Sequence, residues 1–311
     1  MYGETIIKYC DLRPALEAYR KGENVMATLR ELFGEDKNNE QIVEIAYDLQ
    51  AGTYSRYAEE NPAPWNAYCE ELADILSARL EPGWSTLDVG TGEMTTLAGV
   101  ANRAFTEASD TYSCDISFSR IKAGRQFVAR NMEPTLAGRL QSFVGNLFHL
   151  PFQDASVDLI WTSHALEPNG GKEEIALREL FRVAARYTVL FEPSYENNTD
   201  EGRARMERLG YIRGLPEAIA RTGAELVDVI QVKSTGNSLN PTYAYVCRTG
   251  VETHSRATPW ACPETHMPME RLADCFFSKA SRLAYPIIDS IPILRAENAI
   301  LANALDGLDW G

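Results

Sequence analysis

The feature that most constrains this chain is a regular alternation of short apolar runs with longer helical stretches. The runs are rich in β-branched and aromatic residues, which favours strands. They lie at 85–90, 111–116, 140–145, 157–163, 187–193, 224–232 and 242–248. Strands that alternate with helices form βαβ units, whose parallel sheet is covered on both faces. Only a turn-rich segment separates the last two runs, so we expect an antiparallel hairpin at one edge of a doubly wound α/β fold with a mostly parallel, seven-stranded sheet.

Two regions of different texture flank this core. Before it, "PALEAYRKGENVMATLRELFG" and "NNEQIVEIAYDLQAGTYSRYAEENP" have helical patterns that end at a glycine and at a proline. After it, a linker-like stretch leads to a segment with its own cysteines, prolines and an expected terminal helix. The predicted organisation is a helical N-terminal lid or cap at 1–80, the core at 81–250 and a small C-terminal α+β domain at 251–311.

Composition excludes several classes of function. The net charge is −14, and because nucleic-acid affinity depends on neutralising phosphates, no nucleic-acid partner is expected. No apolar stretch is long enough to cross a membrane and the N-terminus lacks a signal-peptide core, so we expect a cytoplasmic protein without a membrane partner. The six cysteines are scattered, which suits reduced thiols better than a disulfide framework.

The most specific short segment is "LDVGTGEM", which begins at Leu87. Two glycines, Gly90 and Gly92, stand between an apolar run and a helical stretch, where backbone N–H groups can approach an anionic ligand at the positive end of a helix. The dinucleotide fingerprint G-x-G-x-x-G would place a third glycine at Thr95, so that fingerprint fails. Asp88, two residues before Gly90, is also foreign to it.

The segment instead resembles the D-x-G-x-G-x-G motif of class I S-adenosylmethionine-dependent methyltransferases with a type 11-like core, and Met94 replaces the last glycine. Three later segments extend the resemblance: "YSCDIS", "GNLFHLPFQDASVDLIWTSHALEP", in which Asn146 replaces an acid, and "ALRELFRV". It implies a Rossmann-like fold, with Asp115 on the cofactor ribose and Asn146 at the adenine amine. The cofactor residues that it implies are Tyr54, Asp88, Gly90, Thr91, Gly92, Asp115, Ile116, Asn146, Leu147 and His164.

Candidate residues for the chemistry follow the fourth and fifth predicted strands, where doubly wound sheets bind ligands. His164 is the best candidate for a general base, because its ordinary pKa lies near neutrality; packing against the cofactor is the alternative role. Glu167 is a second catalytic candidate. The expected substrate contacts are Tyr57, Glu167, Asn169 and Tyr195.

The C-terminal segment resembles a small zinc-ribbon-like domain found in the activating subunit of tRNA and release-factor methyltransferases. Its cysteine pairs are incomplete here, because Thr265 and Ser278 follow Cys262 and Cys275 where the second cysteines would stand. Zinc needs four ligands, and His266 can supply only a third. We therefore expect a degenerate ribbon without a structural metal.

Together these features predict an S-adenosylmethionine-dependent methyltransferase that acts on a small molecule. Two alternatives stay open: an RNA or protein methyltransferase with a fused activator-like domain, and a non-catalytic S-adenosylmethionine-binding module. The sequence identifies neither the methyl acceptor nor the oligomeric state, and a homo-oligomer is left open.

Overall fold

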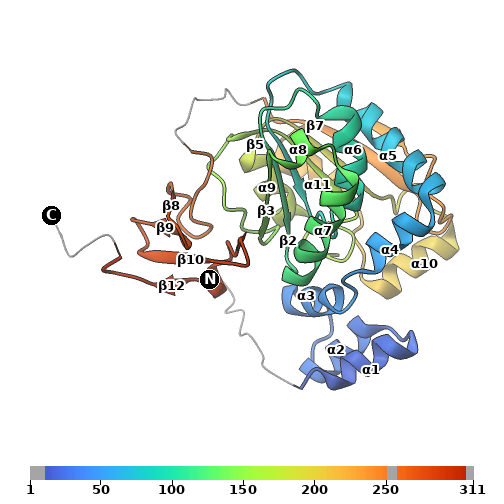
Figure 1. The fold of residues 1–311 in the computed structure, drawn as a ribbon. Helices are drawn as coiled ribbons and strands as arrows, with labels where there is room; N and C mark the ends of the chain where they lie inside the picture. The colour runs from blue at the N-terminus through green and yellow to red at the C-terminus, as the bar shows by residue number, and fades with distance from the viewer. Residues whose placement is uncertain (1–10, 251–257, 306–311) are drawn as a thin grey trace.

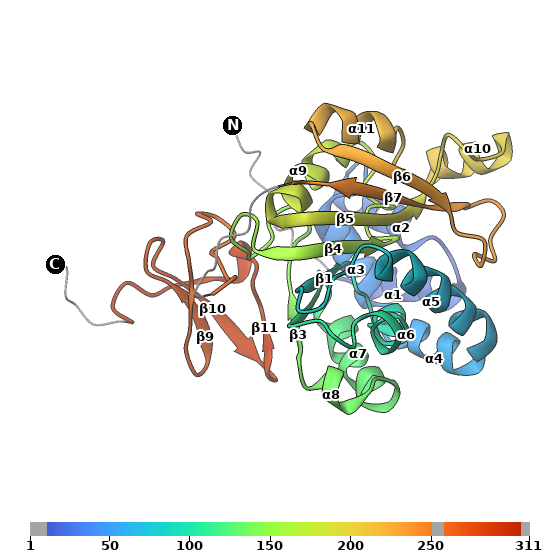
Figure 2. The ribbon, with the colours of Figure 1, turned by 90° about the horizontal axis from the view of Figure 1, so that it is seen from above.

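The computed structural model describes residues 11–250 and 258–305. Its centre is a seven-stranded sheet in the order β3-β2-β1-β4-β5-β7-β6 (Figure 2). The strands from β3 to β5 are parallel, whereas β7 is antiparallel to β5 and β6. The predicted Rossmann-like α/β fold and its antiparallel edge hairpin are confirmed. The strands are β1 Thr86–Val89, β2 Thr111–Asp115, β3 Leu140–Val144, β4 Val157–Ser163, β5 Ala184–Pro193, β6 Glu225–Gln231 and β7 Thr242–Arg248.

Helices cover both faces of the sheet (Figure 1). On one face Leu177 and Ile219, from α9 and α11, are buried in the same apolar cluster as the sheet residue Ile160. On the other, Leu72 and Leu97 of α5 and α6 pack with further sheet residues. The helices after β1 are α6 Thr95–Ala104, α7 Phe118–Asn131, α8 Pro134–Ala137, α9 Glu173–Val183, α10 Asp200–Leu209 and α11 Leu215–Thr222. In the described residues no helix is long and apolar enough to cross a membrane.

The strand register brings the segments after β1, β2 and β4 together. Val89 lies opposite Cys114 on one side and Thr162 on the other. The central strands β1 and β2 are buried along their whole length, as expected for parallel strands covered on both faces. The three turns that follow these strands therefore meet at one edge of the sheet.

Five helices precede the sheet, and glycines separate them more often than the sequence patterns indicate. The first pattern is broken at Gly22 and the second at Gly52, both with positive φ, a conformation that glycine adopts without strain. Figure 1 shows α1 and α2 below the rest of the molecule, with α3 between them and α7. The five are α1 Arg13–Lys21, α2 Val25–Phe33, α3 Glu40–Asp48, α4 Thr53–Glu60 and α5 Pro62–Ser77.

The C-terminal segment forms a small antiparallel sheet beside β3. Ile293 forms an isolated parallel bridge with Val144, the last residue of β3, and Figure 2 shows β11 next to that strand. The expected terminal helix is wrong over the described residues, because Ile300–Leu301 pairs with the strand that begins at Leu283. The elements are β8 Glu270–Arg271, β9 Cys275–Ser278, β10 Leu283–Ile288, β11 Ile291–Pro292, the short 3₁₀ helix η1 Ala296–Asn298 and β12 Ile300–Leu301.

The candidate metal ligands of this segment lie in different environments. Cys262 is fully buried, and its Sγ lies 3.1 Å from the Tyr285 hydroxyl and 3.4 Å from that of Ser281. Cys275 is half-buried and His266 is exposed. Across residues 11–250 and 258–305 no group of three or more histidine, cysteine, aspartate or glutamate side chains is placed to hold a metal ion. The resemblance to a zinc ribbon stays a prediction.

Candidate active site

The glycine-rich turn joins β1 to α6 through a run of left-handed backbone. Gly90, Gly92 and Met94 have φ values of 76°, 57° and 55°. A Cβ on Gly90 would lie 2.3 Å from the Ala165 Cβ, so a side chain at this position would collide with the turn after β4. Met94 accepts the strained conformation with its side chain fully buried, next to Gly124 of α7. A methionine therefore replaces the third glycine by packing α6 against α7.

Asp115, the last residue of β2, organises the turn from the neighbouring strand. Its Oδ2 accepts a hydrogen bond from the Gly92 backbone N–H at 2.8 Å, and its Oδ1 accepts one from the Ser117 N–H at 2.9 Å. Asp88 lies buried in β1, where burial, followed by the nearby charge of Asp115, raises its pKa to about 7. Asp115 faces the open side of the turn, whereas Asp88 supports it from within the sheet.

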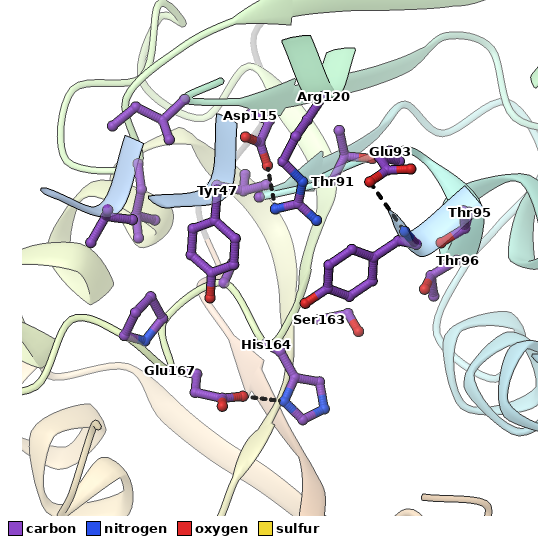
Figure 3. Close-up of a pocket in the computed structure, with 18 of the residues that line it drawn as sticks. Tyr47, Thr91, Glu93, Thr95, Thr96, Asp115, Arg120, Ser163, His164 and Glu167 are labelled. Atoms are coloured by element: carbon purple, nitrogen blue, oxygen red, sulfur yellow. Dashed lines mark hydrogen bonds and ion pairs between the residues drawn. The ribbon is translucent and has the colours of Figure 1, made fainter. Parts of the chain in front are cut away.

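A cavity of about 620 Å³ opens above this edge of the sheet, between the N-terminal helices and the turns (Figure 3). This volume lies within the range of small-molecule sites. Asp88, Gly92 and Tyr195 are not among its lining residues. The other predicted site residues line it: Tyr54, Tyr57, Gly90, Thr91, Asp115, Ile116, Asn146, Leu147, His164, Glu167 and Asn169.

Tyr195 lies away from the cavity on the polar surface near α10. Its hydroxyl donates to Glu207 Oε1 at 2.6 Å, and Arg203 and Arg213 lie near its ring. Asn169 lines the cavity, but its side-chain amide donates to the Ala165 carbonyl at 3.1 Å and so also holds the turn after β4.

His164 and Glu167 form a hydrogen-bonded pair on the wall of the cavity (Figure 3). The His164 Nδ1 lies 2.5 Å from Glu167 Oε2, and its Nε2 lies 3.1 Å from the Thr242 hydroxyl. His164 has a φ of 58°, a left-handed conformation that is uncommon outside glycine. With Nδ1 donating to the carboxylate, proton exchange with a ligand falls to Nε2, which would exchange its contact with the Thr242 hydroxyl for one with the ligand.

Burial and pairing act in opposite directions on this pair. Burial lowers the pKa of His164, but the charge and hydrogen bond of Glu167 outweigh it and raise the pKa above its ordinary value. Burial raises the pKa of Glu167, whereas His164 and other hydrogen-bond donors bring it below its ordinary value. The pairing therefore favours the imidazolium form of His164 and the carboxylate form of Glu167, and His164 becomes a base as the pH rises through its raised pKa.

Glu192 at the end of β5 holds the turn that carries the pair. It is fully buried. Its Oε1 accepts from the Ala165 and Leu166 N–H groups at 3.0 and 3.1 Å, and its Oε2 accepts from the Glu167 N–H at 3.1 Å. A buried carboxylate that accepts several backbone hydrogen bonds fixes a loop, and here it fixes the direction of the two catalytic candidates.

Two polar contacts fasten the N-terminal helices over the cavity. The carboxylate of Glu93, in the glycine-rich turn, accepts from the Tyr54 and Ser55 N–H groups of α4 at 3.3 and 2.8 Å. At the end of α3, Asp48 accepts hydrogen bonds from the hydroxyls of Ser117 and Ser119 at the start of α7. Both helices are therefore tied to the turns after β1 and β2.

The helix α3 also contributes to the polar group around Asn146. The Asn146 Nδ2 donates to Glu40 Oε2 at 2.6 Å, and its Oδ1 accepts from the Phe148 N–H at 3.0 Å. Lys172 lies 3.4 Å from the other oxygen of Glu40. A carboxylate at the start of α3 thus stands beside the Asn146 amide.

Sequence reasoning missed several lining residues, because they come from segments far apart in the chain. Glu40 and Tyr47 lie on α3, Arg120 on α7, and residues 234–237 in the loop between β6 and β7. The one usable signal was the position of Arg120, five residues after Asp115 in the first turns of the helix that follows β2. No local pattern indicates that the other segments approach the turns.

The donors and acceptors of the cavity suit S-adenosylmethionine. The Asp115 carboxylate can accept from ribose hydroxyls, and Asn146 with Glu40 offers acceptors for an exocyclic amine. The start of α6, with Thr95 and Thr96 in the wall, presents the positive end of a helix to an amino-acid carboxylate. Ribose, amine and carboxylate are the polar groups of this cofactor, so the residues present fit it.

Comparison with known proteins places the same segment in one family. Residues 87–190 match a family model described as "Methyltransferase domain". No curated protein matches the chain.

Two solved structures share the fold. One is a complex from Haloferax volcanii between the Trm112 methyltransferase activator and a methyltransferase: TM-score 0.50, 18% identity, covering 65% of this chain and 97% of that chain. The other is the [4+2]-cyclase SpnF, with a TM-score of 0.54 and 17% identity, covering 70% of this chain and 98% of that chain. Residues 87–190 thus match a methyltransferase domain, the chain has a Rossmann-like fold, and these findings support S-adenosylmethionine as its cofactor.

Proposed function

We propose that the protein transfers a methyl group from S-adenosylmethionine to a small molecule held in the cavity. The observation that carries the proposal is the position of the His164–Glu167 pair, which lines the same cavity as Asp115. A nucleoside held at Asp115 and an acceptor beside His164 would share one cavity. In this proposal residues 1–80 act as the lid, residues 81–250 bind the cofactor and residues 251–311 buttress both.

The acceptor's proton is the part of the reaction for which this chain supplies chemistry. S-adenosylmethionine, when bound, offers a methyl group on a sulfonium that is already a good leaving group. His164 Nε2 would take the proton of the acceptor, and Glu167 would stabilise the imidazolium that forms. The lid would exclude water and hold the acceptor in line, which supplies most of the remaining rate enhancement.

Cavity size and charge favour a small acceptor over a macromolecule. The cavity lies between the lid helices and the turns rather than along an open groove, and its volume is about 620 Å³. The net charge of −14 opposes nucleic-acid binding. SpnF, with the same fold, is described as a [4+2]-cyclase, so methyl transfer itself needs a direct test.

The test supplies methyl-tritiated S-adenosylmethionine to the protein with separate small-molecule, protein and RNA fractions of a cell extract. We expect label in the small-molecule fraction, and a loss of about 10²–10⁴-fold in rate for His164→Asn and Glu167→Gln. His149→Asn is the matched control, because His149 is exposed and does not line the cavity.

Label in the RNA or protein fraction would instead support a macromolecular acceptor. Cofactor binding without any transfer would support a non-catalytic binding module. Turnover that survives both substitutions at the pair would remove His164 and Glu167 from the mechanism.

A further inference from the structure

Arg120 is a buried cation in the wall of the cavity. It is 9% exposed and, within the described residues, is the one lysine or arginine that lines the cavity. Its Nε has no hydrogen-bond partner there. The nearest carboxylate oxygen, Asp115 Oδ2, lies 3.7 Å from Nη1, which is too long for a hydrogen bond.

The surrounding carboxylates are already engaged elsewhere. Both oxygens of Asp115 accept backbone hydrogen bonds, and so do both oxygens of Glu93, from the first residues of α4. A buried guanidinium with unmet donors is costly. The protein therefore neutralises the charge of Arg120 in part and leaves its donors to a ligand.

The packing around Arg120 fixes its direction. Its guanidinium carbon lies 4.9 Å from the centre of the Tyr47 ring (Figure 3). It lies 4.8 Å from the centre of the Tyr54 ring. An added Cβ on Gly92 would lie 2.3 Å from its Nη2, so only a glycine leaves room for it. The guanidinium donors lie in one plane as a fork, and a fork matches the paired oxygens of a carboxylate.

We propose that Arg120 is a carboxylate-binding residue, which pairs with a carboxylate of the molecule in the cavity through two parallel N–H···O bonds. The inference rests on the proposed function, because both ligands of that reaction are placed in this cavity. Two sources share the chemistry: the amino-acid carboxylate of the cofactor and a carboxylate of the acceptor. In either case the bound carboxylate would compensate the buried positive charge of Arg120.

The first arm of the test compares two ligands that differ in the amino-acid group. S-adenosylhomocysteine carries the carboxylate, whereas 5′-methylthioadenosine lacks the whole amino-acid end. If Arg120 binds the cofactor, calorimetry should show that Arg120→Met lowers the affinity for S-adenosylhomocysteine by about 10–100-fold. The affinity for 5′-methylthioadenosine should change by less than about threefold. Arg120→Lys keeps the charge and loses the fork of donors, so its affinity for S-adenosylhomocysteine should lie between those of the wild type and Arg120→Met.

The second arm tests the acceptor as the source. Benzoate and benzamide are titrated into protein saturated with S-adenosylhomocysteine, and binding is followed by ligand-detected NMR. If the acceptor supplies the carboxylate, Arg120→Met should abolish the benzoate signal, leave benzamide unchanged and leave the affinity for S-adenosylhomocysteine unchanged.

Arg125→Met is the control for both arms, because Arg125 lies on the same helix and is bound outside the cavity, to the Asp289 carbonyl at 3.1 Å. The inference would be overturned if Arg120→Met and Arg120→Lys lowered the affinities for both nucleosides equally. It would also be overturned if the substitutions changed neither the nucleoside affinities nor the benzoate signal. A wild-type protein that does not bind S-adenosylhomocysteine would refute the proposed function instead, and the benzoate comparison, repeated without the nucleoside, would still test Arg120.

Discussion

Replacing Asp115 by asparagine should lower both the stability of the protein and its affinity for the cofactor. The side chain keeps one acceptor oxygen, but an amide NH₂ replaces the other, so either the Gly92 or the Ser117 N–H loses its acceptor. A buried donor left unpaired costs about 1–3 kcal/mol. For a domain of this size about 2–4 °C of melting temperature corresponds to each kcal/mol, so the melting temperature should fall by about 2–12 °C.

The effect on affinity comes from the ribose. Asp115→Asn loses one of two charge-assisted hydrogen bonds of about 1.5–3 kcal/mol each, so the affinity for S-adenosylhomocysteine in isothermal titration should fall by about 10–100-fold. Asp110→Asn is the matched control, because Asp110 immediately precedes the opposite end of β2 and does not line the cavity. An Asp115→Asn protein that binds S-adenosylhomocysteine as tightly as the wild type would refute the assignment.

Three further perturbations address the lid, the catalytic pair and the C-terminal segment. Glu93→Gln removes the charge that holds the start of α4, so hydrogen exchange should show faster exchange over α4 than in the wild type; unchanged protection would mean that other contacts hold the lid. Glu167→Gln removes the charge and hydrogen bond that raise the pKa of His164. NMR of the imidazole protons should then show His164 losing its proton at lower pH, and an unchanged titration would contradict the pairing. A strong chelator should leave the melting temperature unchanged, because the Cys262 thiol is bound by hydroxyls; stoichiometric zinc or a loss of several degrees would restore the metal site.

The sheet could be predicted from the sequence because each strand is specified locally. Buried β-branched and aromatic runs such as β4 Val157–Ser163 coincide with the predicted segment, and a short turn-rich connection fixes the hairpin of β6 and β7. The C-terminal strand β12 is an element that its local sequence does not predict. "AILANAL" has residues that suit a helix, but Ile300 and Leu301 pair with β10, and such pairing overrides weak helix propensity.

The candidate site also contains residues that a local motif predicts and residues that only the packing of distant segments brings there. Asp115 and the glycines follow from their motif, because the turn needs those residues at that spacing. Arg120 and Glu40 do not, since their importance appears only when α7 and α3 are packed over the turns. Tyr195 follows β5 closely in the sequence, yet its hydroxyl pairs with Glu207 of α10 and not with the cavity. Proximity to a strand end places a residue near a site but does not fix its direction.

A crystal structure of the protein with S-adenosylhomocysteine tests the central claim most directly. The predicted result is the nucleoside in the cavity, with its ribose hydroxyls on Asp115, its adenine beside Asn146 and its sulfur directed toward the space next to His164. A nucleoside bound elsewhere, or a ribose without contact to Asp115, would contradict the account.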